Sequence, residues 1–237
     1  MEARTYVAFF KPYGVLTAFT DEEGRNTLKQ YVDLPDIYPV GRLDMDSEGL
    51  LLLTDDGGLA HRLTDPRSKH PKTYLVQVEG TATPEAIGKL ETGVEIKGER
   101  TRRAQVVLIP EPNLPERAKP ITPHGPTAWL RIVLREGKKR QIRHMTAAVG
   151  LPTLRIVRVA VGPIGVGDLQ PGEWRHLTEA EVGMLKALAS APAEHPRKEA
   201  KPRKKLYTPE PPKLKERRRT PAAGKGPKRP VRRRGTL

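Results

Sequence analysis

The chain contains no cysteine among its 237 residues. This absence excludes disulfide bonds, thiol nucleophiles and cysteine-ligated zinc. Long hydrophobic runs are also missing, because the apolar stretches at 6–10 and 50–53 are far shorter than the roughly 20 residues that a membrane-spanning helix needs. The first of them runs directly into Lys11 and Pro12, which is not the form of a signal peptide. We therefore expect a soluble, cytoplasmic protein.

Acidic residues are scarce at the C-terminal end of the chain. Residues 191–237 hold 17 Lys and Arg against 4 Asp and Glu, together with 9 of the 24 prolines. Such a segment cannot bury enough apolar surface to offset the entropy of ordering it, so we predict a basic, Pro-rich disordered tail. Its charge indicates a polyanionic partner, either nucleic acid or an acidic membrane surface. Residues 1–190 carry 26 basic and 24 acidic groups and are predicted to form a balanced globular domain.

Strand and helix patterns follow one another irregularly in this domain. Strands are predicted at 5–10, 37–43, 50–54, 74–78, 102–109, 128–134 and 153–161, and helices at 27–32, 58–64, 84–90, 139–148 and 178–190. A doubly wound parallel sheet would show regular alternation of the two. We therefore predict an α+β fold, with a mainly antiparallel mixed sheet in two lobes, helices packed on it, and an irregular excursion at 110–126.

The densest motif is acidic and spans residues 41–49. Asp44, Asp46 and Glu48 place three carboxylates within five residues, which is costly without cations nearby. Arg42 is one candidate cation, because Arg42 and Asp44 share a face if strand geometry persists. A solvated turn between two strands is an equally simple interpretation of this segment.

Metal binding is a further interpretation of the same carboxylates. Their alternate spacing resembles a calcium loop, but the EF-hand pattern wants Asp or Asn where Glu48 stands and Glu where Asp55 stands. A metal-binding Asp-x-Asp site of the nucleotide-sugar transferase kind also stays open. We predict that the protein has no metal site and no cofactor.

Two further motifs carry candidate functional residues. In the basic segment 135–145, a helix starting at Lys139 would place Lys139 and Arg143 on one face, although a solvated basic helix face is the simpler interpretation. Tyr74 follows Lys72 at the start of an alternating strand, where a tyrosine is usually a core residue with its hydroxyl bonded at the edge.

Taken together and in order, these motifs resemble the RsuA/RluE family of bacterial ribosomal-RNA pseudouridine synthases, and within it the E-type enzymes of the large subunit. The resemblance covers about residues 5–182. It rests on segments 11–16, 19–25, 41–51, 63–66, 72–74, 136–154 and 172–175.

The resemblance implies a pseudouridine synthase fold with a central RNA-binding cleft, and a reaction that needs no cofactor. Asp44 is similar to the catalytic aspartate, Tyr74 to the active-site tyrosine, and Arg143 to the basic residue that pairs with the aspartate. Arg42 is similar to the arginine that opens the RNA and holds the flipped nucleotide. The expected RNA-binding residues are Arg42, Lys72, Lys138, Lys139, Arg140 and His144.

Some positions depart from the family pattern. Lys138 and Lys139 replace the more usual Arg-Asn, and His144 stands where many members have Arg. The S4 domain that precedes many of these enzymes is expected to be absent, because the first strand begins by Thr5. The implied partner is ribosomal RNA, most specifically 23S, with no membrane and a monomeric enzyme. Two other classes stay open: a non-catalytic RNA or ribosome-assembly binder on the same fold, and a metal-dependent nucleotidyl or glycosyl enzyme.

Overall fold

The computed structural model describes residues 4–190, so the predicted tail at 191–237 lies outside the described residues. The described chain contains helices and strands in mixed order. They are β1 (Tyr6–Lys11), η1 (Leu28–Gln30), β2 (Tyr38–Pro39), β3 (Glu48–Thr54), α1 (Gly57–Thr64), β4 (Lys72–Glu79), α2 (Pro84–Thr92), β5 (Glu95–Ile96), β6 (Glu99–Arg100), β7 (Gln105–Ile109), β8 (Thr127–Leu134), α3 (Gln141–Ala148), β9 (Thr153–Val161), β10 (Ile164–Gly165), β11 (Trp174–His176) and α4 (Glu179–Ser190).

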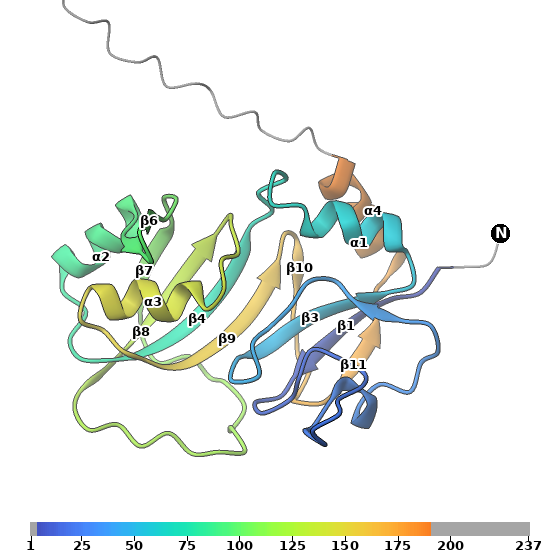
Figure 1. Ribbon diagram of the computed structural model, residues 1–237, viewed down its shortest axis with the longest axis horizontal. Helices are drawn as coiled ribbons and strands as arrows, with labels where there is room; N and C mark the ends of the chain where they lie inside the picture. Colours follow the sequence, from blue (N-terminus) through green and yellow to red (C-terminus); the bar gives the residue numbers. More distant parts are fainter. Residues whose placement is uncertain (1–3, 191–237) are drawn as a thin grey trace, which may run out of the picture. The chain divides into compact units, whose positions relative to one another are not determined.

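A nine-stranded mixed sheet organises these elements (Figure 1). The strand order is β11-β1-β3-β9-β4-β8-β7, with β2 paired to β3 and β10 paired to β9. Only the β3–β9 pair is parallel among these ladders, and it joins the N-terminal strands to the rest of the sheet. The predicted α+β class with a mainly antiparallel mixed sheet is therefore confirmed, and the two lobes share this one sheet.

The N-terminal strands are buried on both faces. Tyr6 and Ala8 of β1 pack in a core cluster with α1 and α4, whereas Val7 and Phe9 pack in a second cluster on the opposite face. The successive leucines of β3 alternate between the same two clusters. Burial on both faces explains why this strand is a continuous leucine run rather than an alternating pattern.

The other half of the sheet has its own core. Tyr74, Val76 and Val78 face the same side of β4, as their spacing predicts, and pack with side chains of β7, β8 and β9 and of helices α2 and α3. Figure 1 shows α2 and α3 beside this half of the sheet, while α1 and α4 lie together near β3.

Helix starts follow the predicted capping chemistry. Thr83 caps α2 by accepting a hydrogen bond from the Ala86 amide at 3.3 Å, with Pro84 in the first helical position. Thr178 and Glu181 form the predicted capping box before α4, with amide contacts of 2.9 and 3.2 Å.

Three local predictions are wrong. The strand expected at 37–43 is only two residues long, so Arg42 and Asp44 lie in a loop rather than on one strand face. The helix expected at 27–32 is a single 3₁₀ turn. The helix expected from Lys139 begins at Gln141, because Arg140 adopts a left-handed conformation with φ of 53°. The short strands β5, β6, β10 and β11 were not predicted.

Within residues 4–190, no helix is both long and apolar enough to cross a membrane.

Candidate active site

The loop between β2 and β3 is fixed on both sides of Asp44. The Thr17 hydroxyl donates to the Leu43 carbonyl at 2.7 Å and accepts from the Leu43 amide at 3.2 Å. The Met45 carbonyl accepts from the Gly14 amide at 2.8 Å. Because both neighbours of Asp44 are held by their backbones, the position of its carboxylate is defined by the fold.

The other two carboxylates of the motif are bound by arginines. Arg140 donates two hydrogen bonds to Asp46 at 3.0 and 2.9 Å, and Arg143 lies 3.2 Å from the same carboxylate. Glu48 is 1% exposed and receives two hydrogen bonds from Arg155 at 2.8 and 2.9 Å. These arginines supply the cations that three close carboxylates require. Nowhere in the described chain do three His, Cys, Asp or Glu side chains group as a metal site.

The pKa of Asp46 shows how strong this arginine environment is. Burial alone would raise the pKa of Asp46, but the hydrogen bond from Arg140 and the charge of Arg143 outweigh burial and lower it. Asp46 is therefore held in its ionised form, and its oxygens are bound by Arg140 and Arg143.

Asp44 differs from both neighbouring carboxylates. Among residues 4–190 no Lys, Arg or His lies within 4.0 Å of its carboxylate, and Asp44 lines a cavity. Arg143, predicted to pair with Asp44, forms its ion pair with Asp46 instead. The carboxylate of Asp44 still interacts electrostatically with Lys11, Arg140 and Arg143. Asp44 thus lies in a positive environment. Its oxygens have no ion-pair partner among residues 4–190 and are available to a ligand.

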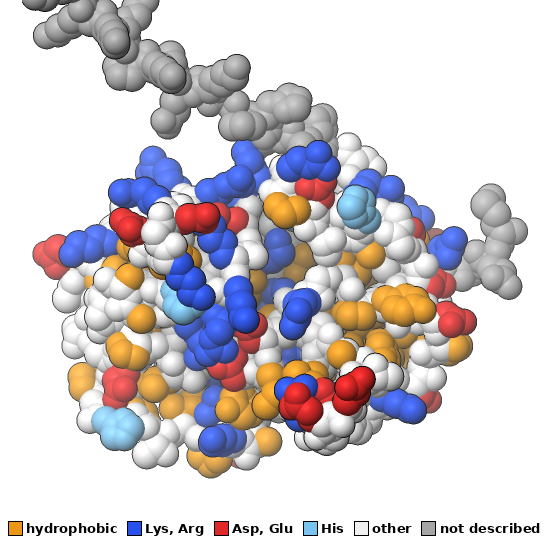
Figure 2. Space-filling model, viewed as in Figure 1, with side chains coloured by type: hydrophobic (Ala, Val, Ile, Leu, Met, Phe, Trp, Pro, Cys, Tyr) orange, Lys and Arg blue, Asp and Glu red, His pale blue; other side chains and the backbone are white. Residues whose placement is uncertain are grey.

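The cavity next to Asp44 has a volume of about 550 Å³, which is within the range of small-ligand sites. Figure 2 shows Lys and Arg side chains gathered around a hollow on this face. Eight basic side chains line it against three acidic ones, Asp44, Asp65 and Glu136. The basic ones are Arg42, Lys69, Lys72, Arg135, Lys138, Lys139, Arg140 and Arg158. An anionic ligand is favoured in such a cavity.

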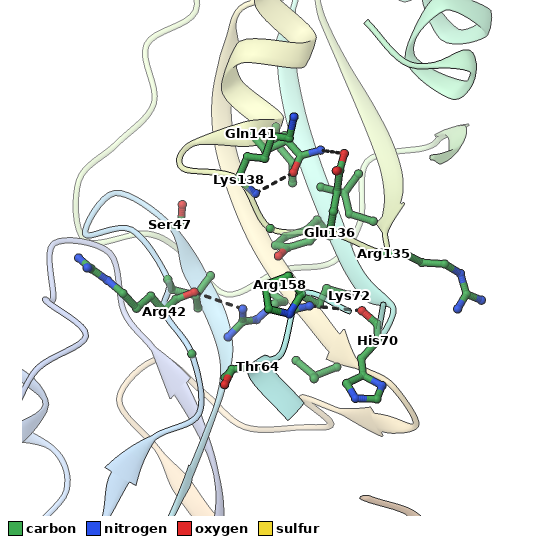
Figure 3. Close-up of a pocket in the computed structure, with 18 of the residues that line it drawn as sticks. Arg42, Ser47, Thr64, His70, Lys72, Arg135, Glu136, Lys138, Gln141 and Arg158 are labelled. Atoms are coloured by element: carbon green, nitrogen blue, oxygen red, sulfur yellow. Dashed lines mark hydrogen bonds between the residues drawn. The ribbon is translucent and has the colours of Figure 1, made fainter. Parts of the chain in front are cut away.

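Most of the predicted site residues meet at this cavity. Its lining includes the predicted Asp44, Tyr74, Arg42, Lys72, Lys138, Lys139 and Arg140, but not Arg143 or His144. Lys138 also forms an ion pair with Glu99 at 2.6 Å. Figure 3 shows the guanidinium of Arg42 turned away from the other labelled side chains, while its carbonyl accepts from Arg158 at 3.5 Å.

Two residues of the site were not identified as functional from the sequence. Lys11 is fully buried, and its amino group donates to three backbone carbonyls, including that of Met45 at 3.4 Å. Arg158 is 3% exposed and lines the cavity. A signal for Arg158 exists in the sequence, because two arginines, Arg155 and Arg158, interrupt an otherwise apolar strand, and buried charges need partners.

Comparisons with known proteins identify a family and similar chains. The profile of the family described as RNA pseudouridylate synthase matches residues 5–148. The chain is 48% identical over 179 residues to ribosomal large subunit pseudouridine synthase E of Vibrio parahaemolyticus, covering 75% of each protein. It is 54% identical over 166 residues to the protein of that name in Xanthomonas axonopodis pv. citri, covering 68% of this chain and 87% of the relative. A crystal structure of a pseudouridylate synthase matches with a TM-score of 0.67 and 28% identity, covering 78% of this chain and 75% of the other.

Proposed function

The chain belongs to the RNA pseudouridylate synthase family, and from this premise we propose that it isomerises one uridine of large-subunit (23S) ribosomal RNA, with Asp44 as the nucleophile. The relatives from Vibrio and Xanthomonas carry names that specify the large ribosomal subunit. The observation that carries the role of Asp44 is its free carboxylate at the wall of a basic cavity.

The reaction needs only groups that this cavity contains. The bond between the ribose and N1 of uracil breaks, a bond to carbon 5 forms, and the proton on carbon 5 leaves while N1 gains one. The carboxylate of Asp44 attacks C1′ of the ribose and displaces the base, which keeps the electron pair of the broken bond. Carbon 5 of the reoriented base then attacks C1′ and releases the carboxylate. Lys11, Arg140 and Arg143 interact electrostatically with Asp44 and place positive charge near the proposed nucleophile.

We propose that Tyr74 interacts with the uracil base of the target uridine. It lines the same cavity as Asp44 and packs against the apolar core through its ring. We propose that the ring stacks on uracil and that Tyr74 assists removal of the proton from carbon 5. Arg143 holds Asp46 and supports the charge of Asp44 from outside the cavity wall.

The target uridine must leave its helical stack, which costs a few kcal/mol. Arg42 is suited to stabilise the opened RNA, since it is exposed, has no ion-pair partner among residues 4–190 and projects from the cavity rim. Lys138, Lys139, Arg140 and His144 are proposed to contact phosphates, and the basic segment 191–237 to add attachment that is independent of RNA sequence. We expect the enzyme to act as a monomer in the cytoplasm, with 1–190 as the catalytic domain.

An Asp44→Asn variant tests the central role. It removes the charge but keeps the shape, so we expect a folded protein that binds RNA and forms no pseudouridine. The matched control is Asp33→Asn, which changes an exposed carboxylate outside the cavity and should keep full activity. Product is measured by chromatography of nucleosides after incubation with ribosomal RNA from cells that lack this chain. Retained turnover in Asp44→Asn would refute the proposed nucleophile.

The same assay separates the two alternative classes. A non-catalytic RNA binder would bind the RNA and leave its uridines unchanged in the wild type. A metal-dependent enzyme would lose its activity in excess EDTA, whereas the proposed mechanism predicts full activity.

A further inference from the structure

Two cations, the buried Arg158 and the half-buried Lys72, line the cavity without a carboxylate partner among the described residues. Arg158 of β9 donates from Nε to the Leu50 carbonyl at 2.8 Å, but its Nη2 atom is buried and has no hydrogen-bond partner. Lys72 of β4 donates from Nζ to the His70 carbonyl at 3.3 Å. Neither side chain has an Asp or Glu within 4.0 Å in the described part of the chain. Figure 3 shows the two side chains near one another.

The two like charges of this pair repel one another. Burial lowers the pKa of Lys72 to about 8, and the positive charge of Arg158 acts in the same direction. Buried charges are normally paired, and a donor that is buried without a partner costs free energy. A bound anionic oxygen would relieve both costs at once.

The position of the pair indicates which part of the substrate it meets. Arg158 lies directly opposite Tyr74 in the antiparallel ladder of β4 and β9. Lys72 precedes Tyr74 by two residues on β4, and all three line the cavity. The cations therefore stand beside the ring proposed to stack on uracil, and Arg158 is only 3% exposed. Because the RNA backbone continues on both sides of the target nucleotide, we expect it to stay at the rim and the base to reach this depth.

We infer that Lys72 and Arg158 form an oxyanion subsite for a carbonyl oxygen of uracil, where negative charge develops when the bond between ribose and N1 breaks. The electron pair of that bond stays on the base and is delocalised onto its carbonyl oxygens. Donors fixed in a water-poor site stabilise such a charge without reorganising. This inference rests on the proposed function and adds a charge-stabilising role to that site.

The test compares Lys72→Met, Lys72→Arg and Arg158→Lys with the wild type in single-turnover pseudouridine formation and in RNA binding. We expect Lys72→Met to slow the reaction about 100-fold, as loss of an oxyanion donor does, while the Kd for ribosomal RNA changes less than about threefold. Lys72→Arg and Arg158→Lys keep the charge and should recover part of the rate. Circular dichroism and the unfolding midpoint establish that each variant is folded.

The pH profile provides a readout that a structural role would not change. Arg158 of β9 and His70 just before β4 interact electrostatically with Lys72. The other charged groups that line the same cavity include Lys69, Asp44, Asp65 and Glu136. In the wild type, kcat/KM should fall with an apparent pKa near 8 as Lys72 loses its proton. Lys72→Arg should remove the part of that fall that comes from Lys72, because arginine stays charged. The part that comes from Lys11, whose pKa burial also lowers to about 8, should remain.

Each other outcome overturns the inference. A raised Kd with an unchanged rate, together with a shallower salt dependence of binding, would assign the pair to a phosphodiester. An unchanged rate and Kd would give the pair no role toward the substrate. An alkaline fall of the same size in Lys72→Arg as in the wild type would assign the titration to another group. Failure of the proposed function is distinguished by the wild type itself, which would then form no pseudouridine.

Discussion

The amino group of Lys11 lies 3.4 Å from the carbonyl oxygen of Met45, so a fully buried cation in the first strand supports the loop that carries Asp44. The same amino group donates to the carbonyls of Pro12 at 2.9 Å and Val15 at 2.7 Å. One side chain thus joins two loops, and the buried charge contributes to the positive environment of Asp44.

We expect Lys11→Met to lower the free energy of unfolding by about 2 kcal/mol, because buried carbonyls lose their donor. Activity should fall by about tenfold or more, since a displaced Asp44 misaligns the reacting groups. The control is Lys29→Met, an exposed lysine in η1, which should change neither quantity. Urea unfolding and single-turnover assays measure the two effects, and equal behaviour of the two variants would contradict the supporting role of Lys11.

The pH dependence of stability gives a second signature of this lysine. Burial lowers the pKa of Lys11 to about 8 from 10.5, so above pH 8 the folded state loses a proton that the unfolded chain still holds. Stability should therefore rise between pH 8 and 9.5, and Lys11→Met should reduce that slope by up to about 1.4 kcal/mol per pH unit. The window ends below pH 10 because burial raises the pKa of Tyr6 to about 12, which gives a slope of opposite sign there.

Local sequence signals were sufficient for many of the elements. The strand predicted at 153–161 matches β9 at both ends, because Pro152 and Gly162 bound an extended apolar run. The capping residues Thr83 and Thr178 fixed two helix starts. Two-residue strands such as β2 and β5 carry no such signal, since they exist only through pairing with a neighbour.

The sequence predicted which residues gather at the site better than it predicted which of them pair with one another. The acidic and basic motifs do meet, but Arg140 and Arg143 bind Asp46, more than ninety positions away, rather than Asp44. Which carboxylate receives which arginine depends on the left-handed turn at Arg140, and no periodicity in the sequence indicates that turn. The burial of Lys11 and Arg158 likewise follows from tertiary packing.

The buried ion pair of Glu48 and Arg155 offers a double-mutant test. Arg155 also donates to the Pro115 carbonyl at 2.8 Å, so it connects the 110–126 loop to the sheet. Removing either partner leaves a buried charge unpaired, and we expect Glu48→Leu or Arg155→Met each to cost about 3–5 kcal/mol of stability. The double variant should lose clearly less stability than the sum of the losses in the two single variants.

The exposed pair of Asp65 and Arg67 is the matched control for this cycle. Arg67 is 81% exposed as a side chain, so solvent screens the pair and its coupling energy should be clearly smaller than that of Glu48 and Arg155. Denaturant unfolding of all variants gives the two coupling energies. Additive costs at Glu48 and Arg155 would mean that their contact does not hold the loop to the sheet.

Gly49 is a position where the two halves of the sheet approach each other closely. It pairs with Arg158 in the parallel ladder of β3 and β9, and its φ of +100° is unfavourable for any residue with a Cβ atom. A Cβ atom there would also overlap the Arg158 carbonyl oxygen, a backbone atom that cannot rotate aside. Gly49→Ala should therefore destabilise the protein by about 3 kcal/mol or more.

Gly57→Ala is the comparison, because Gly57 begins α1, has no positive φ and has no atom within 4 Å of an added Cβ. It should leave stability unchanged or raise it by up to about 1 kcal/mol, since alanine reduces the freedom of the unfolded chain. Thermal unfolding midpoints decide between these expectations. The β3–β9 contact brings the loop that carries Asp44 to the cavity that Arg158 and Tyr74 also line. Any Gly49→Ala protein that still folds should therefore also lose pseudouridine formation. A Gly49→Ala midpoint equal to that of Gly57→Ala would contradict the close approach of these two strands.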